Sequence, residues 1–237
     1  MAAKPDNSKV PAKGGGTAAV KRFLNQVAVA PRRAGGGRGR LIFAMDATAS
    51  REPTWDHACH IQGEMFAATD NLGGLEVQLV FYRGFGECRA SPWVTSSTDL
   101  VRRMTAVTCL GGHTQIGRVL AHAVKETHHK RVDALVFVGD AMEEDVDDLS
   151  HTAGELGLLG VPAFMFHEGH DPIAASGFRQ IAKLTKGAYC PFDAGSAEQL
   201  KALLGAVAVY AAGGRRALED LSRKKGGVVR LLTSDLR

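Results

Sequence analysis

The sequence Leu-Ile-Phe-Ala-Met-Asp-Ala-Thr-Ala-Ser at residues 41–50 decides the fold of this chain. Its first five residues are apolar, the sixth is an acid, and two hydroxyl residues follow the acid at alternate positions. A short apolar run bounded by polar residues predicts a strand that is buried on both faces. The polar cluster Asp46 to Ser50 is therefore expected at the carboxyl end of a strand, where open α/β sheets bind their ligands.

The rest of the chain alternates strand-like and helix-like segments. After the first strand, apolar runs typical of strands occur at 75–82, 88–93, 134–140, 162–167 and 188–192. Apolar residues at helical spacing occur at 53–69, 100–107, 116–124, 146–156, 173–184 and 200–210. Strands that alternate with helices predict a mostly parallel sheet joined by right-handed crossovers. We therefore expect an α/β fold, doubly wound and Rossmann-like, with helices on both faces of a central sheet.

Charge is distributed unevenly along the chain. Of 237 residues, 45% are hydrophobic and 23% are charged, which fits one globular domain with additional sequence outside its core. The formal charge of +4 combines +8 on residues 1–40, −8 on the next 170 residues and +4 on the remainder. We predict a flexible basic N-terminal arm at 1–39, the folded domain at 40–210 and a basic C-terminal tail at 211–237. Within the arm, apolar spacing at 18–29 favours a short amphipathic helix.

Composition excludes several classes of protein. The four cysteines are scattered and form no Cys-x-x-Cys pair, so neither a zinc knuckle nor a disulfide framework is predicted. No stretch approaches the roughly 20 apolar residues that a membrane span needs, and residues 1–16 lack the apolar segment of a secretory signal. We therefore expect a cytoplasmic protein with reduced thiols.

Five oxygen-bearing side chains are expected to converge at the carboxyl edge of the sheet. They are two acids that end apolar strands, two hydroxyl residues that follow the first acid, and a threonine that ends a Gly-Gly-His-Thr loop: Asp46, Asp140, Thr48, Ser50 and Thr114. Carboxylate and hydroxyl oxygens suit hard cations such as Mg²⁺, Mn²⁺ or Ca²⁺. Because three of the donors are neutral hydroxyls, such a cation would keep part of its charge and attract an external carboxylate.

This pattern resembles the von Willebrand factor type A (VWA) domain and its metal-ion-dependent adhesion site (MIDAS). In that family an Asp-x-Ser-x-Ser motif after the first strand combines with a Thr from a later loop and an Asp after the fourth strand. Here residues 46–50 carry Thr48 in place of the first Ser, and the resemblance covers roughly residues 40–210. It implies that the three hydroxyls contact a divalent ion directly and that the two carboxylates act largely through bound waters.

The resemblance also implies a function and a setting. We expect a non-enzymatic module that binds an acidic residue of a partner protein through the metal. Intracellular relatives often serve as adaptors of AAA+ ATPases or within multi-protein assemblies, which implies a bacterial interaction protein of the cytoplasm. The sequence departs from the family at Ala141, where Gly is usual, and in the acidic run at 143–145. That run is expected either to begin a helix favourably or to repel acidic ligands from the ion.

Other functions fit parts of the sequence. A phosphoryl-transfer enzyme of the haloacid dehalogenase type also begins with an Asp after a buried strand, but it needs a second Asp at the position of Thr48 as general acid or base. Sequence-independent contact with nucleic acid through the two basic ends is a further alternative. No Gly-x-x-x-x-Gly-Lys-Ser/Thr phosphate loop occurs. Two histidine pairs are spaced like metal ligands but lack a third ligand and are expected on the surface: His57 and His60, His167 and His170.

Overall fold

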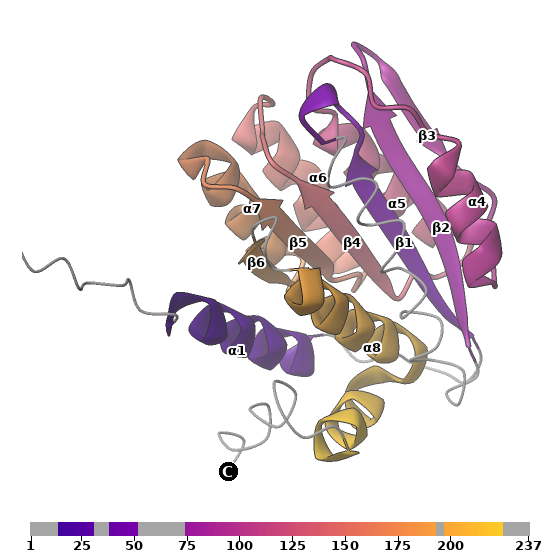
Figure 1. Ribbon diagram of the computed structural model, residues 1–237, viewed down its shortest axis with the longest axis vertical. Helices are drawn as coiled ribbons and strands as arrows, with labels where there is room; N and C mark the ends of the chain where they lie inside the picture. The colour runs from indigo at the N-terminus through magenta and orange to yellow at the C-terminus, as the bar shows by residue number, and fades with distance from the viewer. Residues whose placement is uncertain (1–13, 31–37, 52–73, 193–196, 225–237) are drawn as a thin grey trace, which may run out of the picture.

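A six-stranded, mostly parallel sheet organises the chain (Figure 1). The structure is a computed structural model and describes residues 14–30, 38–51, 74–192 and 197–224. The strand order is β3-β2-β1-β4-β5-β6, and only β2 and β3 pair in antiparallel fashion. The predicted doubly wound α/β fold is thus confirmed.

Strands and helices alternate along the chain much as the apolar pattern predicts. The strands are β1 (Gly39–Asp46), β2 (Leu75–Arg83), β3 (Glu87–Ala90), β4 (Ala134–Gly139), β5 (Ala163–Glu168) and β6 (Ala188–Phe192). The helices are α1 (Gly14–Val29), α4 (Ser97–Thr105), α5 (Ile116–His129), α6 (Val146–Leu158), α7 (Pro172–Leu184) and α8 (Ala197–Lys224), with a 3-10 turn η1 (Ala49–Arg51). The helix predicted at 53–69 lies outside the described residues. None of the described helices is both long and apolar enough to cross a membrane.

Both faces of the central strand β1 are covered by helices. Successive strand residues point to opposite faces of a sheet. Leu41, Phe43 and Met45 therefore lie in the core cluster that includes α1, α4 and α8. Ile42 and Ala44 lie in the cluster formed with α5, α6 and α7. Because all five side chains are fully buried, β1 has no polar face, which explains its uninterrupted apolar run.

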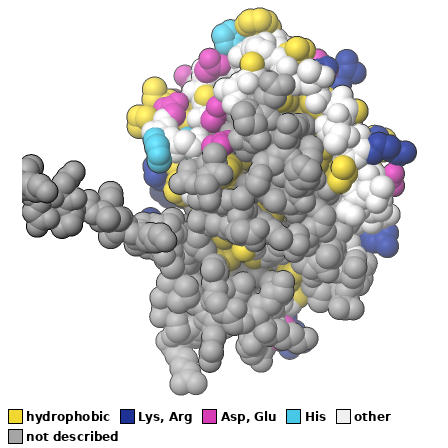
Figure 2. All heavy atoms as spheres, in the orientation of Figure 1, with side chains coloured by type: hydrophobic (Ala, Val, Ile, Leu, Met, Phe, Trp, Pro, Cys, Tyr) yellow, Lys and Arg dark blue, Asp and Glu magenta, His cyan; other side chains and the backbone are white. Residues whose placement is uncertain are grey.

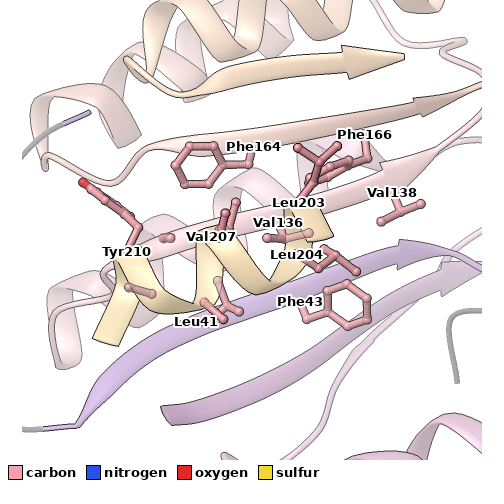
Figure 3. Close-up of a cluster of buried hydrophobic side chains, with 14 of the residues drawn as sticks. Leu41, Phe43, Val136, Val138, Phe164, Phe166, Leu203, Leu204, Val207 and Tyr210 are labelled. Carbon is pink, nitrogen blue, oxygen red and sulfur yellow. The ribbon is translucent and has the colours of Figure 1, made fainter. Parts of the chain in front are cut away.

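Helix α8 covers the centre of one face of the sheet (Figure 3). Apolar side chains of α8 meet those of β1, β4 and β5 in one cluster: Leu203, Leu204, Val207 and Tyr210 from the helix, and Leu41, Phe43, Val136, Val138, Phe164 and Phe166 from the strands. The helix continues past residue 210, where a basic tail was predicted, and Ala211 is still fully buried. It kinks at Gly214, whose φ of 67° lies in the left-handed region that favours glycine.

The N-terminal segment contributes a helix to the same core. Helix α1 includes the segment predicted as a helix at 18–29, and its Phe23 is fully buried. The ring centroid of Phe23 lies 6.0 Å from that of Phe164 and 5.0 Å from that of Phe166. The apolar face of α1 is covered by the sheet and α8. The prediction of a flexible arm over 1–39 therefore does not hold for the residues of this helix.

Replacing Phe23 by Ala tests whether α1 belongs to the core. Phe23→Ala is expected to lower the free energy of unfolding by about 3–5 kcal/mol, because a fully buried ring is lost and a cavity remains. Val29→Ala in the same helix, at a side chain that is 64% exposed, is expected to cost less than about 0.5 kcal/mol. Urea unfolding of both variants measures the difference, and equal effects would contradict the packing of α1.

Candidate metal centre

The register of the sheet brings polar strand ends to one edge. Asp46, the last residue of β1, lies opposite Tyr82 of β2, and Met45 lies opposite Val138 of β4. Asp140 follows β4 directly and lies two residues beyond Val138. It therefore reaches the same edge of the sheet as Asp46. The two acids that end the central strands are therefore neighbours in space although they are far apart in the sequence.

Four of the five candidate residues form a continuous hydrogen-bonded chain. The carboxylate oxygen Oδ1 of Asp46 accepts a hydrogen bond from the backbone N–H of Thr48 at 2.7 Å. The hydroxyl oxygens of Thr48 and Ser50 lie 3.3 Å apart. The Ser50 hydroxyl donates to Oδ2 of Asp140 at 2.8 Å. The turn after β1 thus connects two hydroxyls with the carboxylate that follows β4.

The backbone around Ala47 explains why alternate side chains face the same way. Because the Asp46 carboxylate accepts the N–H two residues ahead, the chain turns directly after the strand and continues as η1. The N–H of Ala47 donates to the carbonyl of Tyr82 at 2.9 Å, and its carbonyl accepts the N–H of Leu110 at 3.0 Å. The turn is held from both sides, so Thr48 keeps its hydroxyl beside Ser50 despite its extra methyl group.

Thr114 belongs to an adjoining set of hydrogen bonds. Its hydroxyl accepts the N–H of Glu143 at 2.9 Å and donates to the carboxylate of Glu144. Its own N–H donates to Oε2 of Glu143 at 2.9 Å. The loop that carries Thr114 is therefore held by two acids of the run at 143–145, a role that the sequence did not predict for them.

Tyr82 lies between the two sets of hydrogen bonds and was not a predicted site residue. Its side chain is fully buried. Burial raises the pKa of its hydroxyl well above the usual value, and the negative charges of Asp46, Glu144 and Asp140 raise the pKa further. The charges of carboxylates from both sets of hydrogen bonds therefore act on this one hydroxyl. The position of Tyr82 at the end of a predicted strand was its signal in the sequence.

The prediction that His167 lies on the surface is wrong. Its side chain is 1% exposed, and its Nε2 lies 3.3 Å from the backbone carbonyl oxygen of Asp140. Its Nδ1 lies 2.9 Å from the Tyr189 hydroxyl. Because a carbonyl oxygen can only accept, the neutral imidazole carries its proton on Nε2 and accepts from Tyr189. His167 therefore fixes the backbone at Asp140, whereas His170 is exposed as predicted and the pair at 57 and 60 lies outside the described residues.

The donor atoms of this edge suit a hard cation. Oδ1 of Asp140 is buried and has no hydrogen-bond partner among the described residues, which is costly for a carboxylate oxygen unless a cation or water meets it. Among the side chains that the structure describes, no Lys or Arg pairs with Asp140 or Glu144. The described residues contain no cluster of three or more His, Cys, Asp or Glu that could hold a metal, so hydroxyls are needed to complete the donor set.

Acidic side chains also mark this part of the surface. On the face shown in Figure 2, Asp and Glu side chains gather at the upper left, toward the carboxyl ends of the parallel strands in Figure 1. Such a cluster of like charge concentrates cations in its neighbourhood. The charge of the surface and the donor atoms of the edge therefore favour the same kind of ligand.

The fold matches known structures, whereas the sequence does not. No family model matches the sequence, and no curated protein matches it. Proximal thread matrix protein 1 from the mussel byssus is similar with a TM-score of 0.59 at 16% identity, over 75% of this chain and 49% of that protein. The SpRpn10 VWA domain gives 0.54 at 12% identity, over 75% and 97% of the two chains. The pilus adhesin SpaC from Lactobacillus rhamnosus GG gives 0.56 at 11% identity, over 77% and 31%.

These similarities establish that the chain has the fold of VWA domains. The chain spans about half the length of the mussel protein. A second structure of that protein, with a TM-score of 0.58 at 14% identity over 73% of this chain and 48% of that one, holds zinc in its MIDAS motif. At identities of 11–16%, the similarity shows a shared fold alone.

Gly112 sets the distance between the loop before Thr114 and the turn between β2 and β3. A Cβ on Gly112 would lie 2.1 Å from the carbonyl oxygen of Gly84, a backbone atom that cannot rotate away. The next residue, His113, donates its N–H to the same oxygen at 3.2 Å. A Cβ on Gly111, in contrast, would meet nothing within 4 Å.

Gly112→Ala is therefore expected to push the loop away from the turn. The free energy of unfolding should fall by about 1–3 kcal/mol, the usual cost of overpacking. Gly111→Ala serves as the matched control and should change it by less than about 0.5 kcal/mol. Urea unfolding measures both variants, and a Gly112→Ala protein as stable as its control would refute the close approach.

Stability is expected to fall at mildly acidic pH because of His167. Burial lowers the pKa of its imidazole, so below the ordinary value of roughly 6.5 the unfolded chain binds a proton that the folded chain does not. His167→Gln removes this contribution while keeping a polar side chain. Between roughly pH 7.5 and 5.5, the free energy of unfolding should fall more steeply in the wild type than in His167→Gln. Parallel pH profiles would show that His167 titrates normally.

Proposed function

We propose that this protein is a non-enzymatic interaction module that binds an acidic residue of a partner protein through a divalent cation. The cation is Mg²⁺, with Mn²⁺ or Ca²⁺ as substitutes, and is held by Asp46, Thr48, Ser50, Thr114 and Asp140. The observation that carries the proposal is the series of hydrogen bonds in which Asp46 accepts the backbone N–H of Thr48, the Thr48 hydroxyl lies beside that of Ser50, and Ser50 donates to Asp140.

The chemistry of these donors supports a cation that stays attractive to carboxylates. The three hydroxyls would bring oxygens to the ion without bringing charge, so the charge of the ion would be only partly cancelled by its direct ligands. A cation bound in this way supplies an electropositive point at the surface, which a carboxylate of a partner completes. Within the chain, Asp46 and His167 hold the backbone turns from which the hydroxyls and Asp140 project.

Exposed apolar side chains beside the site support a protein as the ligand. Phe85, in the turn between β2 and β3, is 82% exposed, and its ring centroid lies 5.0 Å from that of His113, the residue before Thr114. Leu110 in the same loop is 45% exposed. Apolar surface next to a polar centre is typical of protein interaction sites. One of the structural neighbours, SpaC, is by name a pilus adhesin.

The alternatives draw less support from the structure. A haloacid dehalogenase mechanism needs a carboxylate at position 48, where the hydroxyl of Thr48 instead faces Ser50. Contact with nucleic acid depends on basic residues at the two ends, many of which lie outside the described segments. An AAA+ ATPase or a multi-protein assembly in the cytoplasm is the partner and setting that we assign to the proposed module.

Calorimetric titration with Mg²⁺ and Mn²⁺ tests the cation directly. Asp46→Ala is expected to abolish the heat of binding because it removes both a carboxylate and the turn that places Thr48. Ser50→Ala removes one exposed hydroxyl, which leaves the fold intact, and should weaken binding at least about tenfold, since Ser50 also orients Asp140. Glu155→Gln, an exposed acid on α6, is the matched control and should bind as the wild type does.

Two results of this titration would contradict the proposal. Absence of heat from the wild type would show that the oxygens do not form a cation site under these conditions. Equal affinity in the wild type, Ser50→Ala and Asp46→Ala would place the cation elsewhere on the acidic surface.

A further inference from the structure

The acidic run at 143–145 gives each of its carboxylates a different role. Asp145 caps α6 by accepting the N–H of Asp147 at 2.7 Å. Glu143 is 51% exposed and accepts from the backbone of Thr114. Glu144 turns toward the candidate metal centre instead. The sequence does not distinguish these three acids, whereas in the structure each carboxylate accepts hydrogen bonds from different groups.

Both oxygens of the Glu144 carboxylate are held in place. One oxygen accepts the Thr114 hydroxyl, and the other accepts the N–H of Gly117 at 3.1 Å. The N-cap residue of α5, Gln115, makes no capping hydrogen bond with its side chain. Glu144 therefore supplies the acceptor at the start of α5, where the helix dipole favours a negative charge.

Glu144 lies close enough to Tyr82 for its charge to act there, as do the two Asp residues. The Tyr82 hydroxyl is fully buried. Asp46, Glu144 and Asp140 all act on this hydroxyl through their charge. The charge of a third carboxylate therefore acts near this edge, in addition to the charges of Asp46 and Asp140.

We propose that Glu144 is an internal competitor of the partner, because its carboxylate occupies the place beside Thr114 that an acidic residue of the partner takes in the complex. This inference rests on the proposed function. The contact that carries it is the hydrogen bond from the Thr114 hydroxyl, the fifth candidate donor, to Glu144. In the free protein that donor is already engaged by a carboxylate of the same chain.

Charge makes the competition exclusive. A divalent cation neutralises Asp46 and Asp140, and Glu144 adds one further negative charge at the centre. An incoming carboxylate is repelled as long as Glu144 stays, because like charges in a partly buried site oppose each other strongly. Partner binding is therefore an exchange of one carboxylate for another, and its apparent affinity is reduced by the fraction of molecules in which Glu144 is in place.

Mn²⁺ and acetate serve as probes of this exchange. Water proton relaxation of the Mn²⁺-loaded full chain reports the waters on the ion, and acetate titration reports how readily an external carboxylate displaces them. Glu144→Gln keeps one acceptor oxygen, which can still receive the N–H of Gly117, so α5 stays capped while the charge is lost. Glu155→Gln is the matched control, because Glu155 is an exposed acid on α6 that pairs with His128.

Glu144→Gln is expected to lower the acetate concentration at half displacement by about tenfold, since an intramolecular competitor is removed. Its affinity for Mn²⁺ should fall, while Glu155→Gln should match the wild type in both measurements. An acetate midpoint in Glu144→Gln within twofold of the wild type would overturn this inference and leave the cation site standing. A wild type that binds no Mn²⁺, or binds it equally well after Asp46→Ala, would overturn the proposed function and this inference together.

Discussion

The parallel register of β1 with its neighbours β2 and β4 is the constraint on which the rest of the structure depends. It places Asp46 opposite Tyr82 and brings Asp140 to the same edge of the sheet. The register is fixed because both faces of β1 are buried, and a shift by one residue would exchange the side chains of the two core clusters. The packing of the core therefore determines which polar atoms meet at the edge.

The chemistry of that edge follows from its partial burial. Asp46 and Tyr82 are fully buried, and Asp140 directs one oxygen inward without a partner among the described residues. Acidic groups gathered in this way stabilise a cation and are unfavourable without one. Around them, backbone contacts are short and numerous: Ala47 is held by Tyr82 and Leu110, and Asp140 by His167. The protein thus uses a rigid frame to hold a set of oxygens that repel one another.

Local sequence patterns predicted most of the strands and helices, but few of the contacts between them. The apolar runs before Asp46 and Asp140 identified both central strands. A buried strand can be predicted from its own apolar residues, without knowledge of the strands that pair with it. The spacing at 18–29 predicted a helix with an apolar face, yet nothing in it shows that Phe23 packs on β5. The burial of His167 and the contact of Glu144 with Thr114 were missed for a similar reason. Burial and side-chain direction depend on the surrounding tertiary structure, and the neighbours of these residues are distant in the sequence.

The central claim is that hydroxyls of Thr48 and Ser50 and the carboxylate of Asp140 form one cation site. A crystal structure of the protein soaked in Mn²⁺ tests it most directly, because the anomalous signal of manganese locates the ion without reference to any assumed ligand. The account predicts one anomalous peak at the carboxyl ends of β1 and β4, in contact with Ser50. A peak confined to the acidic surface of α6, or no ordered peak at saturating Mn²⁺, would contradict it.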